Sequence, residues 1–192
     1  MAILLPSPSV LSLEEFLKQP ETKPASEYID GRVYQKPMPQ GKHSRLQTRF
    51  PSEINRILEP PRLGCAFTEL RCTFGGRSLV PDITVFEWGR IPINDAGEVE
   101  NQFLIYPDWT IEIFSPDQRP TRVINNILFC LNHGTQLGWL IDPEERTVIV
   151  FQPHQQPIAS DEDTDQLIVL DSLGDWQLTI AELFSWLSFS PG

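Results

Sequence analysis

Two acidic residues stand in strand-like surroundings and could perform chemistry together. Asp82 follows Val80-Pro81 at the start of the apolar run "ITVF", and Glu112 lies within "TIEIF". Burying an unpaired carboxylate costs several kcal/mol, so such a residue needs a partner or a purpose. Acids on adjacent strands, with their side chains in register, can hold one Mg²⁺ whose remaining ligands are waters. Such an ion activates a water and neutralises the charge that develops on a phosphoryl group.

For each acid alone, the alternative is a strand-end carboxylate that accepts hydrogen bonds from backbone amides. Other catalytic patterns do not compete with the pair. The sequence has no G-x-S-x-G elbow, no P-loop and no G-x-G-x-x-G motif, and its histidines lack zinc-ligand spacing. The principal candidates are therefore Asp82 and Glu112.

Local signals predict the helices around these acids. A capping box at the start of "SLEEFLKQP" predicts a short helix, and apolar residues at helical spacing predict a longer one over 42–58. Pro51 is expected to kink or interrupt the longer helix. Another helix is predicted over 121–133, after the turn "SPDQRP", and a last one near 179–187.

The strands are predicted from β-prone runs bounded by turn residues. The Asp-Gly pair in "EYIDGRVYQ" predicts a hairpin, and "LGWLID" with "TVIVFQ" predicts another. The stretches "CAFTELRCTF" and "LVPDITVFEW" are strand-like, and further strands are predicted over 109–114 and near 167–170. A polar and acidic loop is expected between 89 and 102.

Length and composition favour one globular domain over residues 1–192. No apolar run approaches the roughly 20 residues that span a bilayer, and "MAILLPSPSV" lacks the basic region of a signal peptide. The three cysteines show no C-x-x-C spacing, which indicates free thiols. We therefore expect a cytoplasmic protein without a membrane segment.

The net charge of -11 argues against indiscriminate binding of polyanions. The charge is uneven, however, because the segment 32–77 holds nine basic and three acidic residues, a net charge of +6. On the predicted helix, Lys42, Arg45, Arg49 and Arg56 fall on one side and form a candidate nucleic-acid-binding stripe. The alternative is an ordinary solvated helix.

A series of short motifs resembles a known family. In chain order they are "EEFL", "EYIDGRVY", "PMP", "HS", "VPDITV", "IEIFSP", "HGTQLGWLIDPEERTVIVF" and "LTIAELF". The series resembles a family of restriction-endonuclease-like proteins, expanded in cyanobacteria, within the PD-(D/E)XK nuclease superfamily. The resemblance runs from about residue 13 to residue 187. It implies an α/β (α+β) fold: a restriction-endonuclease-like core with a mixed central β-sheet flanked by helices.

The resemblance also assigns roles. It implies that Asp82 and Glu112 bind Mg²⁺, or Mn²⁺ in its place, and that Glu27 matches an auxiliary acid of the N-terminal hairpin. His43, near the start of the basic helix, is a second auxiliary candidate. DNA is the implied partner, and we expect a homodimer.

One family feature is missing from its usual place. In the superfamily, a lysine beside the second acid orients the attacking water, and in this family it comes from the helix after the "SP" turn. The matching residue is Asn126, and all four lysines precede Asp82 in the chain. Asparagine hydrogen-bonds a water but carries no charge, and Arg122, one turn earlier, cannot act as a general base. The sequence thus predicts impaired catalysis that Asn126→Lys improves, with Asn126 or Arg122 near the water.

Three hypotheses of function remain open. The first is an Mg²⁺-dependent DNA endonuclease of the PD-(D/E)XK type. The second is a catalytically silent dimeric module that binds or assembles. The third is hydrolysis of a phosphate ester other than DNA by the same pair of acids.

Overall fold

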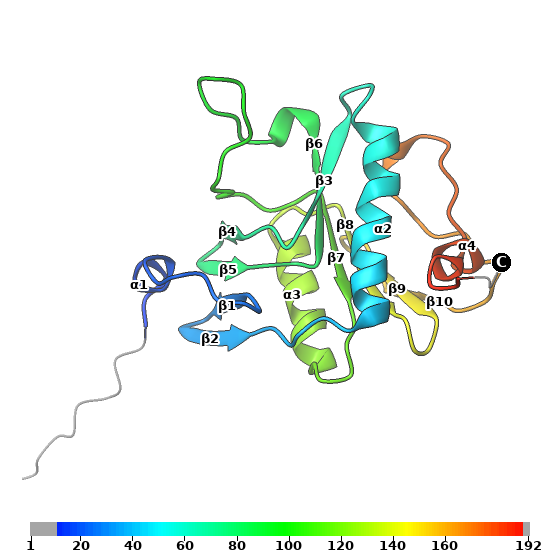
Figure 1. Ribbon diagram of the computed structural model, residues 1–192, viewed down its shortest axis with the longest axis horizontal. Coiled ribbons are helices and arrows are strands. Elements are labelled where there is room, and N and C mark those ends of the chain that lie inside the picture. Colours follow the sequence, from blue (N-terminus) through cyan, green and yellow to red (C-terminus); the bar gives the residue numbers. More distant parts are fainter. Residues whose placement is uncertain (1–10, 190–192) are drawn as a thin grey trace, which may run out of the picture.

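The computed structural model describes residues 11–189, so the apolar stretch at the N-terminus lies outside the described residues. Four helices surround the sheets in Figure 1: α1 (Leu13–Leu17), α2 (Gly41–Leu58), α3 (Pro120–Asn132) and α4 (Ile180–Ser185). A four-stranded sheet has the order β2-β1-β5-β4 and consists of β1 (Ser26–Ile29), β2 (Arg32–Gln35), β4 (Cys72–Phe74) and β5 (Arg77–Leu79). A six-stranded sheet has the order β10-β9-β8-β7-β6-β3 and consists of β3 (Gly64–Thr68), β6 (Ile83–Glu87), β7 (Trp109–Ile113), β8 (Leu137–Asp142), β9 (Thr147–Phe151) and β10 (Ile158–Ser160). This mixed α+β architecture confirms the expected fold class.

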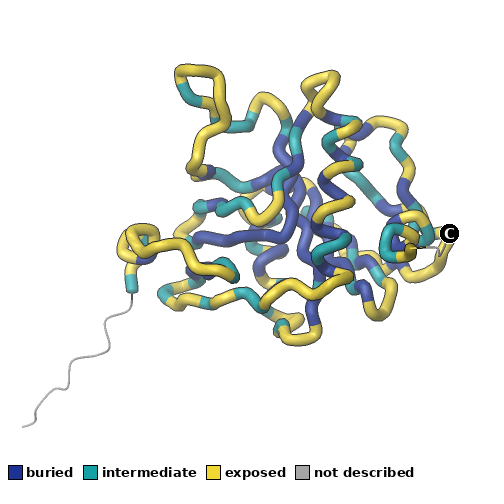
Figure 2. Tube along the Cα trace, in the orientation of Figure 1, coloured by how far each residue is buried: buried dark blue, intermediate teal, exposed yellow. Residues whose placement is uncertain are grey.

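The two faces of the six-stranded sheet carry different helices. Trp109 and Ile111 of β7 belong to the main core with α2 and α4, whereas α3 packs through Ile127 against Leu140 on the other face. Because side chains alternate along a strand, Glu112 points to the face that α3 covers. Buried residues lie along the strands of this sheet in the middle of the molecule (Figure 2). The candidate acid therefore lies between the sheet and α3.

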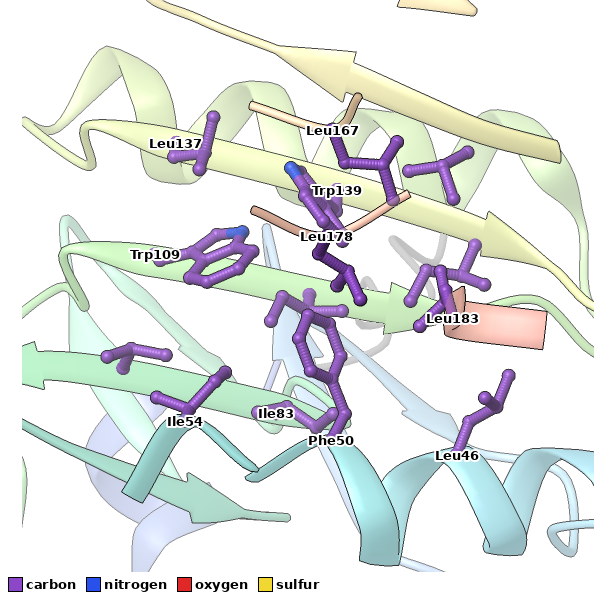
Figure 3. Close-up of a cluster of buried hydrophobic side chains, with 14 of the residues drawn as sticks. Leu46, Phe50, Ile54, Ile83, Trp109, Leu137, Trp139, Leu167, Leu178 and Leu183 are labelled. Atoms are coloured by element: carbon purple, nitrogen blue, oxygen red, sulfur yellow. The ribbon is translucent and has the colours of Figure 1, made fainter. Parts of the chain in front are cut away.

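The centre of the main core is aromatic. Phe50 of α2 packs against Trp109 and Trp139, with ring centroids 5.5 and 5.4 Å away (Figure 3). The expected interruption at Pro51 is wrong, because α2 continues through it. Pro51 is buried and removes one N–H from the helix. The apolar face around Phe50 and Ile54, fully buried on the sheet, holds the helix together across that lost hydrogen bond.

Two strand-like stretches divide between the sheets. The first splits into β3 and β4, with Glu69 between them at a φ of +49°. The second splits into β5, which ends at Leu79, and β6, which begins at Ile83. Asp82 consequently lies where the chain passes from one sheet to the other.

The strand predicted near 167–170 is wrong. This segment is extended, and the backbone carbonyl of Ile168 accepts a hydrogen bond of 3.0 Å from the Trp139 indole, but no sheet strand forms there. The edge beside β9 is occupied by β10 instead. The segment instead makes an isolated antiparallel bridge, Gln166 to Thr179, and the buried side chains of Leu167 and Leu170 pack on the main core.

Gly138→Ala should separate α3 from the sheet. An added Cβ would overlap Cγ2 of the buried Ile127, so the Ile127 side chain, or α3 with it, must shift. We expect a loss of about 1–3 kcal/mol in the free energy of unfolding, which is typical of overpacking. Urea titration measures it. Gly89→Ala is the control, because no atom lies within 4 Å of its added Cβ. Equal losses in both variants would contradict the packing argument.

Candidate active site

The two strand acids lie side by side. In the β6–β7 ladder Ile83 is opposite Ile111, and the same register one residue further places Asp82 opposite Glu112. Both side chains are almost fully buried, with 1% and 4% exposure. Asp82 Oδ2 accepts a hydrogen bond of 2.7 Å from the backbone N–H of Ile113, which ties it to β7. The two carboxylates therefore lie where β6 begins and β7 ends, on the same face of the sheet.

A lysine from the N-terminal hairpin connects these acids. Lys36, directly after β2, donates to Asp82 Oδ1 at 2.6 Å, to Glu112 Oε2 at 3.3 Å and to the Val80 carbonyl at 2.8 Å. The three acceptors use all three donors of the ammonium group. Lys36, for which the sequence predicted no role, thus lies between the two acids that were expected to share Mg²⁺. Its one sequence signal is its place at the end of the Asp-Gly hairpin.

A third buried acid and Asn126 adjoin this cluster. Glu27 of β1 accepts a hydrogen bond from the Val80 N–H at 2.9 Å and another from Asn126 Nδ2 at 3.1 Å. Asn126 Oδ1 is buried and has no hydrogen-bond partner among the described residues. Asn126 thus donates to Glu27, and it lines the same hollow as Glu112.

The other two candidates lie on either side of the cluster. His43 of α2 places Nε2 3.5 Å from Asp82 Oδ1, and its Nδ1 lies 3.2 Å from the Ser115 hydroxyl. The Arg122 guanidinium lies 4.0 Å from the centre of the Tyr34 ring. His43 therefore belongs to the cluster, whereas Arg122 lies at its outer side and is not the cation of Glu112.

Burial and Lys36 determine the charges of the cluster. Burial disfavours the ionised form of Asp82, but Lys36 and His43 outweigh it and hold the pKa of Asp82 below its ordinary value. Burial, reinforced by Asp82 and Glu27, raises the pKa of Glu112 well above the ordinary range. Burial also raises the pKa of Glu27. For Lys36, burial opposes the charge, but the carboxylates outweigh it and raise its pKa, so it stays protonated.

The cluster opens into a hollow of about 300 Å³, the active-site hollow, which is lined by Glu27, Tyr34, Gln35, Lys36, Pro37, Glu112, Asp117, Gln118, Arg119, Arg122, Val123 and Asn126. The buried carboxylates of Glu27 and Glu112 line it together with Lys36, Asp82 lies behind Lys36, and Asn126 Oδ1 has no donor among the described residues. These oxygen donors suit Mg²⁺ or Mn²⁺. No group of three His, Cys, Asp or Glu side chains among residues 11–189 is arranged to hold a metal. One or two carboxylates with waters suffice for Mg²⁺, so the residues fit the ion.

Three of the four cations of the basic stripe on α2 have acidic partners, but these partners are only two acids. Arg49 and Arg56 both pair with Glu53, at 2.6 and 3.1 Å. Lys42 pairs with Glu144 at 2.8 Å, and Arg45 is half-buried and donates to the carbonyl of Trp186 at 2.9 Å. The expectation of four exposed cations on one face is therefore wrong for Arg45, and the other three have acidic partners.

The fold, with paired acids at the end of one hairpin of a mixed sheet, is that of the restriction-endonuclease-like nucleases. Residues 13–181 match the model of the Uma2 family, described as "Putative restriction endonuclease". The chain is 57% identical to a crystal structure described as a "putative nuclease" from Anabaena variabilis, with a TM-score of 0.91, over 92% of this chain and 99% of that one. No functionally curated protein matches. The chain belongs to the Uma2 family.

The part of the chain that the structure describes contains no helix long and apolar enough to cross a membrane.

Lys36→Met should destabilise the fold in a pH-dependent way. Removing the partner of buried carboxylates typically costs about 3–5 kcal/mol. In the wild type, the lowered pKa of Asp82 gives stability that is present above its unfolded pKa and lost as pH falls through the folded value. In the variant that contribution is missing, and the buried acids favour their protonated forms. The difference in unfolding free energy should therefore be largest near neutral pH and shrink towards about pH 4.

Lys42→Met is the matched control, because its pair with Glu144 is half-exposed and should contribute less than about 1 kcal/mol. Urea unfolding at several pH values measures both variants. A pH-independent loss, or equal losses at the two positions, would show that Lys36 does not compensate the buried acids.

Proposed function

We propose that this protein is a metal-dependent endonuclease that hydrolyses DNA phosphodiesters, with Asp82 and Glu112 holding Mg²⁺. The observation that carries the proposal is the Lys36 ammonium between these two carboxylates. Two acids and one lysine are the charged groups of a PD-(D/E)XK site. Here the lysine comes from the N-terminal hairpin instead of the strand or the following helix.

In this proposal, Lys36 supplies the positive charge that no lysine after Asp82 provides. Hydrolysis forms a bond from a water oxygen to phosphorus and breaks the bond to a sugar oxygen, while negative charge builds on the phosphoryl oxygens. The raised pKa of Lys36 keeps it protonated, so its role is to stabilise this charge rather than to accept the water's proton. The expectation of impaired catalysis rested on the absence of a lysine from the site, and under this proposal Lys36 takes that role.

The remaining residues position the acids and the lysine. Glu27 holds the backbone of Val80, whose carbonyl in turn accepts from Lys36. His43 contacts Asp82 from the side of α2. When bound, Mg²⁺ would lower the pKa of a coordinated water and neutralise part of the phosphate charge.

A plasmid-nicking assay with Mg²⁺ or Mn²⁺ tests the proposal. We expect the wild type to nick, and Asp82→Asn and Glu112→Gln to lose the activity. Lys36→Gln should lower the rate by about 10²–10³, as is typical for loss of one group that stabilises developing charge. Asn126→Lys should bring no gain, because it adds a cation beside Glu27 while Lys36 already lies between Asp82 and Glu112.

Circular dichroism shows whether each variant folds, and Lys42→Gln is the control for loss of an exposed lysine. Absence of nicking by the folded wild type would support the silent module. Hydrolysis of a small phosphodiester without DNA cleavage would favour another phosphate ester. A folded Lys36→Gln variant with unchanged rate would remove Lys36 from the reaction.

Metal binding should strengthen with pH. The raised pKa of Glu112 means that the ion must displace a proton there, so affinity should increase as pH rises through that pKa. The increase in melting temperature on adding Mn²⁺, measured with the wild type and with Glu112→Gln, reports this without activity. An equal shift in both proteins, or one independent of pH in the wild type, would place the ion elsewhere.

A further inference from the structure

A second hollow adjoins the active site. It measures about 620 Å³ and is lined by Ile29, Asp30, Tyr34, Arg77, Arg119, Thr121, Arg122, Asn125, Asn126, Leu128, Phe129 and Asn132. We call it the outer hollow. Its walls are the β1–β2 hairpin and one side of α3. Four residues, Tyr34, Arg119, Arg122 and Asn126, line both hollows, so the two form one continuous depression.

The shared wall carries positive charge without acidic partners. Arg119 and Arg122 form no salt bridge with any acid among the described residues, whereas Arg77 in the same hollow pairs with Asp30 at 2.6 Å. Arg119 is exposed and Arg122 half-exposed. On a chain with a net charge of -11, two adjacent unpaired arginines beside a cluster of acids indicate a site for an anion.

The floor of the depression offers complementary groups. Asn126 is buried, with 6% exposure, and its Oδ1 accepts no hydrogen bond from the described residues. Beside it, the Tyr34 ring lies under the Arg122 guanidinium, and Asn125 is exposed at the outer wall. Guanidinium groups bind phosphate through several N–H donors, and aromatic rings and amides contact sugars and bases. An extended polymer of phosphates, sugars and bases matches this arrangement better than a single small anion does.

We infer that the outer hollow binds the DNA strand to be cut, with Arg119 and Arg122 contacting phosphates next to the one that reaches Lys36 and Glu112. This inference rests on the proposed nuclease function. It transfers the DNA-binding surface from the α2 stripe, where three of the four cations have acidic partners, to the hairpin and the N-terminal part of α3 with its N-cap. Arg119, the N-cap of α3, and Arg122 in its first turn thus belong to the same segment as Asn126.

The test is binding of a fluorescent oligonucleotide in EDTA, so that no cleavage occurs, as a single strand and as a duplex. Arg119→Gln/Arg122→Gln should weaken binding about tenfold at low salt. It should also flatten the dependence of log K on log[salt] by roughly 0.9 per lost duplex phosphate contact, or roughly 0.7 per single-strand contact. Arg119→Lys/Arg122→Lys keeps the charges and should retain most of the salt dependence.

Arg49→Gln/Arg56→Gln removes the same charge from α2 and decides between the two surfaces. The inference is supported if the α3 double variant weakens binding and the α2 double variant changes it less than about twofold. It is overturned if the α2 variant weakens binding as much, if the α3 variant binds normally, or if the wild type binds neither DNA form at low salt. Circular dichroism confirms that each variant folds.

The two proposals fail in different ways. Specific loss of binding in the α3 double variant, together with a wild type that never nicks, would leave the binding site standing and remove the nuclease reaction. Normal nicking by that variant at an unchanged KM would leave the reaction standing and remove the outer hollow as its binding site.

Discussion

The site depends on one buried cation shared between two strands. Asp82 and Glu112 are nearly inaccessible to water, and each would be costly to bury alone. Lys36 lies between them and also binds the carbonyl of Val80. The same contacts attach the N-terminal hairpin to the edge of the six-stranded sheet, so the charges of the site also hold the two sheets together. Stability and chemistry are thus coupled at this point.

The lysine beside the two acids comes from a different element than the family pattern predicts. In the family pattern it comes from the helix after the "SP" turn, and here that helix carries Asn126, which binds Glu27. A positive charge between two acids depends on where the ammonium lies and not on which element carries it. The β1–β2 hairpin lies close to Asp82 because β1 pairs with β5, and the chain runs from the end of β5 to Asp82. Helix α3 does not carry this lysine, and its polar and basic side chains line the outer hollow instead.

The positions of the salt bridges also change which basic surface is the candidate for binding an anion. Sequence position grouped four cations of α2 on one side, and their spacing on the helix is as expected. Three of them pair with only two acids: Arg49 and Arg56 share Glu53, which is near in sequence, and Lys42 pairs with the distant Glu144. Arg119 and Arg122, which no charge run marks in the sequence, keep no acidic partner among the described residues. Net charge of a segment therefore does not show where an anion binds.

Local patterns in the sequence determined most elements of the fold and the two strand acids. The Asp-Gly hairpin, the helices and most strands follow from turn chemistry and periodicity, which act between residues a few positions apart. The ordered motifs further indicated the nuclease fold and the family. Tertiary structure alone decided how "LVPDITVFEW" divides between two sheets and which cation meets Glu112. Lys36 is 76 residues from Glu112 in the chain, and an ion pair at that separation leaves no periodic signal, because only the packing of the hairpin on the sheet brings the two charges together.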